Sequence, residues 1–183
     1  CNAHVTTFIP YIAQQILRQL DLEFVILGGP ENCCGSIDKN LGDGDLQEEV
    51  ATKALLGFRR AHPKRVLSIC PDCDEIFAEY RLKDSPFHHS NISELFVEYL
   101  EILKARMQPI NRRVVVHFHD INQSRQDDAD RVLTILKTIP GLEILPAKHN
   151  HGPGIHCQTV HPMPPEDQAK MFAEAKELGA HAL

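Results

Sequence analysis

Five of the six cysteines in the sequence fall into one spaced pattern, and their thiols are the groups best suited to chemistry. The pattern consists of Cys1, the adjacent pair Cys33 and Cys34 before a glycine, and Cys70 and Cys73 in a Cys-Pro-Asp-Cys segment. A lone zinc ion closes its shell with four ligands, whereas iron–sulfur clusters are held by Cys thiolates that often include a CxxC. Five grouped thiols therefore indicate a cluster-binding redox protein.

The CxxC segment on its own leaves other chemistry open. Cys70 follows a predicted strand, and Cys73 lies in the first turn of a predicted helix. The same arrangement is typical of a metal-free dithiol oxidoreductase, whose thiolate is stabilised by the helix N-terminus. Four of the five cysteines could instead bind zinc in a structural or assembly module, or the thiols could be buried and unreactive. Metal content separates these hypotheses.

A second group of possible ligands lies in the C-terminal half. His119 follows a predicted strand, and His151 and Cys157 lie in a later loop. They could form a zinc-like metal site or donate protons beside a cluster. The plainer interpretation is that the imidazoles are exposed or hydrogen-bonded and that Cys157 is a small buried apolar residue. His88 and His89 precede a predicted helix cap and are expected to face solvent.

Short apolar runs alternate with amphipathic segments along the chain. The runs predict strands at 24–27, 66–69, 113–118 and 142–145. Helical spacing of apolar residues predicts helices at 6–22, 46–62, 73–80, 91–107, 127–139 and 165–178. This alternation predicts an α/β fold with a largely parallel sheet. Ligands in such folds gather at the carboxyl ends of strands, where the two cysteine loops would converge.

The order of elements is repeated weakly in the two halves of the chain. Residues 1–109 contain the complete five-cysteine motif, and residues 110–183 repeat the order of elements without those cysteines. We therefore expect two pseudo-repeated Rossmann-like halves that form one compact domain. The cluster site would lie at the C-terminal ends of the strands in the first half.

The composition excludes several function classes. A net charge of -6 over 183 residues argues against a nucleic-acid partner, because phosphate binding needs a basic face. No apolar run approaches the length of a direct membrane span, and no segment is typical of a secretory signal peptide. Six cysteines with a CxxC favour metal or redox chemistry in a reducing compartment, so a cytoplasmic location is expected.

The cysteine pattern resembles the CCG, or cysteine-rich, domain found in the disulfide-handling iron–sulfur subunit of heterodisulfide reductase. Related modules occur in the iron–sulfur subunits of glycolate, lactate and glycerol-3-phosphate oxidoreductases and in thiol:fumarate reductase. The flanking segments are similar as well, over essentially the whole chain. They are Cys-Pro-Asp-Cys at 70–73, Glu94-Leu95-Phe96, and His119-Asp120 at the start of the second half.

The resemblance implies a cofactor, a ligand set and partners. All five ligands of a non-cubane 4Fe–4S cluster are matched, by Cys1, Cys33, Cys34, Cys70 and Cys73. The implied protein is an oxidoreductase subunit that transfers electrons or handles a small thiol or disulfide substrate. Its partners would be flavin- or ferredoxin-type redox subunits in a complex.

The second motif of that family is altered in this sequence. Asn122 stands where a cysteine would follow His119-Asp120, and Asn150-His151-Gly152 stands in place of the second Cys-Cys-Gly. The resemblance therefore implies one cluster in this chain rather than two.

Overall fold

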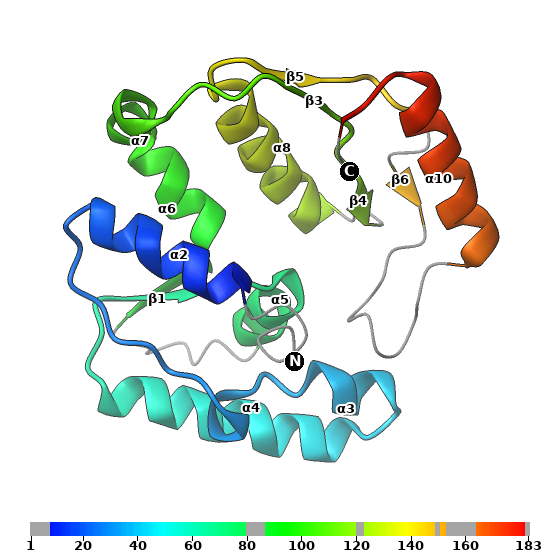
Figure 1. Cartoon of the computed structure of the whole chain (residues 1–183). Helices are drawn as coiled ribbons and strands as arrows, with labels where there is room; N and C mark the ends of the chain where they lie inside the picture. The colour runs from blue at the N-terminus through cyan, green and yellow to red at the C-terminus, as the bar shows by residue number, and fades with distance from the viewer. Residues whose placement is uncertain (1–7, 80–86, 120–122, 149–150, 153–163, 182–183) are drawn as a thin grey trace. The chain divides into compact units, whose positions relative to one another are not determined.

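The computed structural model describes residues 8–79, 87–119, 123–148, 151–152 and 164–181 (Figure 1). The chain divides into two compact units, Cys1–Leu95 and Phe96–Leu183. Both units combine helices with short parallel strand pairs, which confirms the mixed α/β class predicted from the sequence.

The first unit is built around one pair of parallel strands, β1 (Arg65–Ser68) and β2 (His88–Asn91). Arg65 pairs with His88, and Ser68 pairs with Asn91. The helices of this unit are α2 (Phe8–Gln19), the 3-10 turn η1 (Pro30–Asn32), α3 (Ser36–Asn40), α4 (Gly44–Arg60) and α5 (Pro71–Glu79). The helix α6 (Ile92–Glu98) begins directly after β2.

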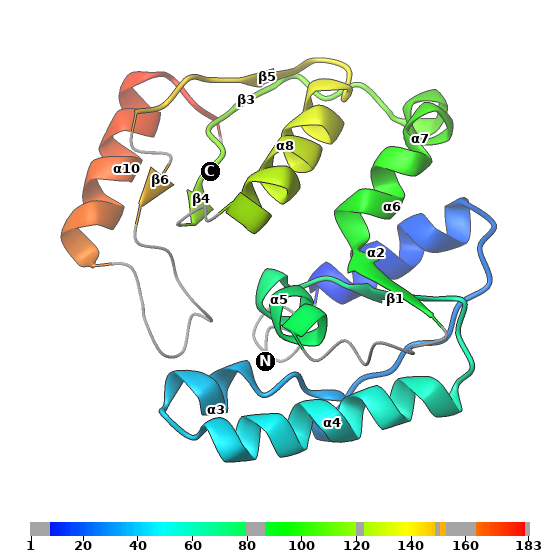
Figure 2. The same ribbon diagram turned by 180° about the vertical axis from the view of Figure 1, so that it is seen from behind.

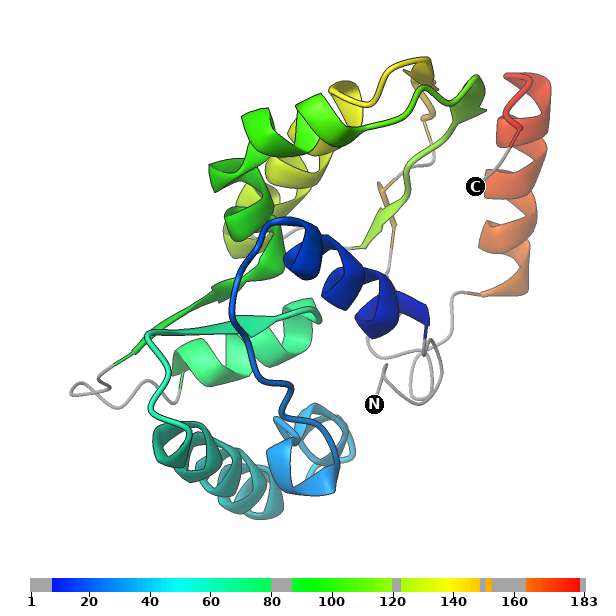
Figure 3. The same ribbon diagram turned by 60° about the vertical axis from the view of Figure 1, so that its left-hand side comes forward.

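Helix α5 links β1 to β2 and lies in the middle of the first unit. It contacts both strands on one side and α3 and α4 on the other (Figure 2). Helix α2 lies on the opposite side of the strands from α5 (Figures 1 and 3). Because a parallel pair needs a crossover connection, β1, α5 and β2 form the structural centre of this unit.

The core of the first unit lies between α4 and α5. Helix α4 begins at its N-cap Asp43, whose carboxylate accepts the Leu46 N–H at 3.0 Å. The rings of Phe58 and Phe77 meet edge to face with their centroids 5.1 Å apart. The core residues are Cys34, Ala51, Ala54, Leu55, Phe58, Ile76, Phe77 and Phe87. The buried positions of α4 recur every three or four residues, as expected for one face of a helix.

The second unit contains two further parallel pairs, β3 (Arg112–Val114) with β5 (Leu142–Ile144) and β4 (Phe118–His119) with β6 (His151–Gly152). Its helices are α7 (Leu100–Arg106), α8 (Gln123–Lys137) and α10 (Pro165–Glu177). Helices α8 and α10 lie on opposite sides of these strands (Figures 1 and 3). Val115, Leu145 and Ala175 form its small apolar core.

One predicted strand is wrong. Residues 24–27 form no strand, and the described part of the chain supplies no strand that pairs with them. Three of the four side chains are exposed, at 72% for Val25, 57% for Ile26 and 41% for Leu27. A β-branched run becomes a strand only when a neighbour completes its backbone hydrogen bonds.

Other boundaries also differ from the sequence-based expectation. The strand β2 was missed because its sequence, His-His-Ser-Asn, lacks an apolar pattern. The helix predicted at 91–107 is divided into α6 and α7 at Tyr99. The strand predicted at 113–118 is divided into β3 and β4. Within the described residues, every helix is too short or too polar to span a membrane.

Candidate functional site

The structure brings four of the five predicted cysteines together in the first unit. Cys33 and Cys34 lie between η1 and α3, Cys70 lies between β1 and α5, and Cys73 lies in the first turn of α5. The Cys73 thiol donates to the Cys34 sulfur at 3.1 Å. Cys34 also hydrogen-bonds Cys33, and Cys73 also hydrogen-bonds Cys70. The sulfurs therefore form a continuous chain in the order 33, 34, 73, 70.

Gly35 makes the turn that brings the adjacent cysteines against α4. Its φ is 74°, in the left-handed region, and a Cβ there would lie 3.0 Å from the Cα and the carbonyl oxygen of Gln47. The Gly35 N–H donates to the Cys33 sulfur at 3.4 Å. The buried Gln47 side chain reaches the Cys34 carbonyl oxygen at 3.5 Å. Only glycine permits this close approach of the cysteine loop to the helix.

Two polar contacts join α3, which directly follows the cysteine loop of residues 33–35, to α5. Near the start of α5, the buried Ser36 hydroxyl donates to the Asp72 carboxylate at 3.4 Å. Near its end, Lys39 forms a partly exposed ion pair with Glu79 at 3.0 Å. Because both partners on the loop side belong to α3, these contacts hold α3 alongside α5. They thereby keep the two cysteine pairs next to each other.

The chain of sulfur contacts divides the thiols into two types. Hydrogen bonds received from Cys34 and from the Gly35 N–H lower the pKa of Cys33 to about 5, against the effect of burial. A hydrogen bond from Cys73 lowers the pKa of Cys70 to about 6. Donation to Cys33 raises the pKa of Cys34 to about 12. The single proton of Cys73 is shared between the Cys34 and Cys70 sulfurs, which raises the pKa of Cys73. At neutral pH the outer sulfurs are thiolates, and the inner two keep their protons.

The donor set fits a group bound through thiolate, but the inner sulfurs lie close together. Four-coordinate zinc with Zn–S bonds of about 2.3 Å places neighbouring sulfurs about 3.8 Å apart, whereas the Cys34 and Cys73 sulfurs are 3.1 Å apart. Among the described residues, no three or more His, Cys, Asp or Glu side chains surround a common point as metal ligands do. A metal or cluster would therefore require these two thiols to separate and lose their protons.

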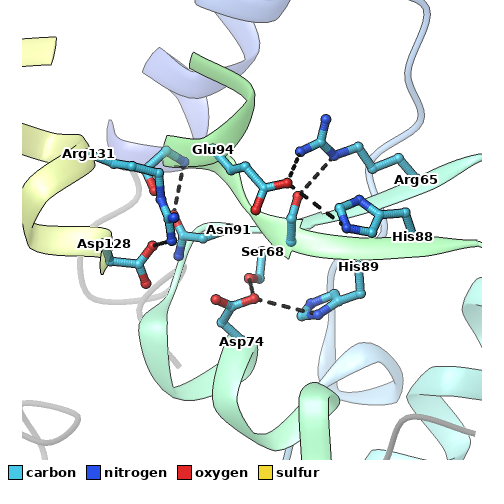
Figure 4. Close-up of polar contacts among 11 residues, drawn as sticks. Arg65, Ser68, Asp74, His88, His89, Asn91, Glu94, Asp128 and Arg131 are labelled. Carbon is cyan, nitrogen blue, oxygen red and sulfur yellow. Dashed lines mark hydrogen bonds and ion pairs between the residues drawn. The ribbon is translucent and has the colours of Figure 1, made fainter. Parts of the chain in front are cut away.

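A largely buried polar group joins β1, α5 and β2 (Figure 4). Asp74 accepts a hydrogen bond from the Ser68 hydroxyl at 3.2 Å and lies 3.5 Å from His89 Nδ1. His89 is buried and meets the ring of Phe77 edge to face. The expectation that His89 faces solvent is therefore wrong, whereas His88 is exposed. Successive side chains of a strand point to opposite faces, so His88 and His89 of β2 differ in exposure. The sequence does not predict a strand at β2 and therefore does not predict this difference.

A second polar group fixes β1 against β2 (Figure 4). Arg65 donates to the Ser90 hydroxyl at 2.9 Å and to the Glu94 carboxylate at 2.7 Å. Arg65 lies at the start of β1, and Ser90 lies on its partner strand. These bonds support the strand that leads into Cys70.

The remaining predicted site residues are less fully described. Cys1 and Cys157 lie outside the described residues. His119 and His151 belong to the paired strands β4 and β6, where Phe118 pairs with His151 and His119 pairs with Gly152. Their backbones are thus neighbours, and the second metal site stays a prediction.

The thiol arrangement can be compared with known proteins. Residues 1–77 match the family of the cysteine-rich domain, CCG. The match confirms the resemblance predicted from the cysteine spacing, and it contains the four described cysteines as well as Cys1.

Two curated relatives extend the similarity beyond the residues that match the CCG family. The chain is 24% identical over 148 residues to the probable iron-sulfur-binding oxidoreductase FadF of Bacillus subtilis (strain 168), covering 78% of this chain and 21% of that protein. It is 24% identical over 120 residues to one subunit of the dihydromethanophenazine:CoB–CoM heterodisulfide reductase of Methanosarcina barkeri (strain Fusaro / DSM 804), covering 60% of this chain and 29% of that protein. The chain thus spans less than a third of either relative. No solved structure matches it significantly.

The turn at Gly35 can be tested against a matched glycine. Gly42 also has a positive φ, of 90°, but a Cβ there would meet nothing within 4 Å. We expect Gly42→Ala to lower the free energy of unfolding by about 1 kcal/mol, from backbone strain alone. Gly35→Ala should lower it by about 3 kcal/mol, because the Cβ also presses on α4. Urea denaturation of the reduced, metal-free protein measures both, and equal losses would contradict the role given to Gln47.

The division of the thiols predicts a pH titration. In reduced, metal-free protein, thiolate absorbance should rise as the pH is raised from about 4 to about 7, because the pKa values of Cys33 and Cys70 are about 5 and about 6. Cys33→Ser and Cys70→Ser should each remove one of the two thiolates. Absorbance that appears only above about pH 8, as for an ordinary cysteine, would contradict the hydrogen-bonded chain of sulfurs.

Proposed function

We propose that this chain is the cluster-binding part of an iron–sulfur oxidoreductase. The proposed ligands of its one cluster are Cys1, Cys33, Cys34, Cys70 and Cys73. The observation that carries the proposal is the convergence of four thiols from two segments of a CCG domain. Thiolates are the ligands that hold iron–sulfur clusters, and they bind in the deprotonated form. The relative from B. subtilis, named as probably iron–sulfur-binding, supports the same cofactor.

The residues of this chain would prepare the site in a defined way. The Cys33 and Cys70 thiolates are already deprotonated at neutral pH, whereas Cys34 and Cys73 would release their protons on binding. The Gly35 N–H would remain a donor to the Cys33 sulfur, and such hydrogen bonds raise the reduction potential of sulfur-bound centres. When bound, the cluster would supply one-electron transfer.

The finer features of the proposal come from the resemblance. They are a non-cubane 4Fe–4S cluster, a small thiol or disulfide as substrate, and flavin- or ferredoxin-type subunits as partners. The similarity to one component of a heterodisulfide reductase supports membership of a complex. A cytoplasmic location remains part of the proposal, because grouped free thiols suit a reducing compartment.

We further propose that the chain consists of two pseudo-repeated Rossmann-like halves, 1–109 and 110–183. The parallel strand pairs with adjacent helices in both units support this organisation. A second metal site at His119, His151 and Cys157 is proposed in the later half. Its support is the pairing of β4 with β6, which makes the backbones of the two histidine-bearing strands neighbours.

Metal and sulfide content tests the proposed function. The full chain, purified without oxygen, should contain about four iron and four acid-labile sulfide and should be brown. Cys34→Ser should lose most of the iron, whereas Lys53→Ala, which replaces an exposed side chain of α4, should keep it. Zinc bound to four of the cysteines is the rival. One zinc per chain without sulfide would contradict the proposal and leave a structural metal module.

A further inference from the structure

The contact between Cys34 and Cys73 joins two segments that are distant in sequence. Their sulfurs lie 3.1 Å apart, and 39 positions separate the residues. Cys34 is only 1% exposed and belongs to the apolar core, and Cys73 packs against that core. We propose that, in the metal-free protein, Cys34 and Cys73 are a modification site that closes to a disulfide when a small-molecule disulfide is present.

The geometry favours a disulfide between Cys34 and Cys73 over one between Cys33 and Cys34 or between Cys70 and Cys73. Cys33 and Cys34 are adjacent, so their Cα atoms lie about 3.8 Å apart, below the usual range for a disulfide of about 4.4–6.8 Å. Cys70 also hydrogen-bonds Cys73, but Cys70 lies outside the apolar core cluster that packs Cys34 and Cys73 together. Packing of α4 against α5 therefore keeps the Cys34 and Cys73 sulfurs in contact before any bond forms.

The reaction proceeds by two thiol–disulfide exchanges. Exchange requires a thiolate, so the half-buried Cys73 thiol first loses its proton to solvent. Its sulfur then attacks the small disulfide, forms a mixed disulfide, and releases one small thiolate, which takes up a proton. The Cys34 thiol then loses its proton as its sulfur attacks the Cys73 sulfur, and the second small thiol leaves with that proton. One protein S–S bond forms and one small-molecule S–S bond breaks. The two cysteines are oxidised by two electrons in total, and their two protons end on the two small thiols.

The disulfide would control the proposed cluster site, and this part of the inference rests on the proposed function. Cys34 and Cys73 are two of the proposed ligands, and a disulfide sulfur no longer offers a thiolate. The oxidised domain would therefore accept no cluster until a thiol reduces it. The same bond would tie the cysteine loop to α5 in the metal-free state, where it replaces the sulfur contact seen here.

Disulfide mapping tests the inference on the wild-type chain. Reduced, metal-free protein is treated with oxidised glutathione, digested without reductant and analysed by mass spectrometry. We expect one dominant cross-linked peptide pair, containing Cys34 and Cys73, with the loss of two free thiols per chain. The melting temperature should rise by more than about 5 °C, because the bond closes a long loop. A dominant Cys70–Cys73 cross-link, or glutathione adducts without a cross-link, would overturn the inference.

Matched variants and a loading assay complete the test. Cys33→Ser and Cys70→Ser should still form the Cys34–Cys73 cross-link, since neither removes a bonding partner, and its loss in both would overturn the inference. Reduced and oxidised wild-type protein are then incubated with iron and sulfide without oxygen. The reduced form should take up iron, and the oxidised form at least tenfold less. If the cross-link forms but the reduced form binds no iron, the proposed function fails while the modification site stands. Equal uptake of iron by both forms would overturn the inference that the disulfide controls cluster binding.

Discussion

Burial of the Cys34 thiol between the cysteine loop and α5 is the constraint on which the rest of the site depends. Adjacent cysteines cannot both point into a core, and here one is buried while its neighbour Cys33 stays half-buried. A buried polar atom needs a hydrogen-bond partner, and Cys73 supplies it from the first turn of α5. The position of Cys34 therefore fixes which residues of the loop and of α5 face each other.

The core and the site are two sides of one packing arrangement. The edge-to-face contact of Phe58 and Phe77 locks α4 to α5, and Cys34 belongs to the same cluster. Helix α5 in turn sets the direction of Cys73, while β1 leads into Cys70. The polar contact of Ser36 with Asp72 ties the loop to this rigid frame. Cys73 is thus carried by a helix, Cys70 by the short link between β1 and α5, and Cys33 and Cys34 by the turn before α3.

The chain of hydrogen bonds along the sulfurs explains how thiols can share this small space. Cys34 and Cys73, in the middle of the chain of sulfurs, keep their protons. Cys33 and Cys70, at its two ends, carry the negative charges, which are thereby kept apart. Burial alone would raise the pKa of every thiol in the group. The donated hydrogen bonds reverse that effect at the two ends. Metal-free protein can therefore hold thiolates ready for a ligand without filling its core with charge.

Features determined by neighbouring residues could be predicted from the sequence, and features determined by distant partners could not. The strand before Cys70 and the helix that begins around Cys73 follow from local apolar spacing and were predicted nearly in place. The run at 24–27 has the composition of a strand but lacks a paired neighbour in the described chain. The strand β2 shows the converse, because pairing with β1 makes a strand of four polar residues. The same holds for the site. The cysteine spacing indicates which thiols belong together. It does not predict the contact of Cys34 with Cys73 or the burial of His89, because both depend on the packing of α5.

X-ray absorption at the iron edge tests the central claim most directly, that these cysteines form one thiolate site for a cluster. The full chain, reduced and then loaded with iron and sulfide without oxygen, should give a first shell of sulfur only and clear iron–iron scattering. Cys34→Ser and Cys73→Ser should each lose the iron–iron signal, because each removes a sulfur from the buried centre of the site. A first shell of nitrogen or oxygen without iron–iron scattering would contradict the account.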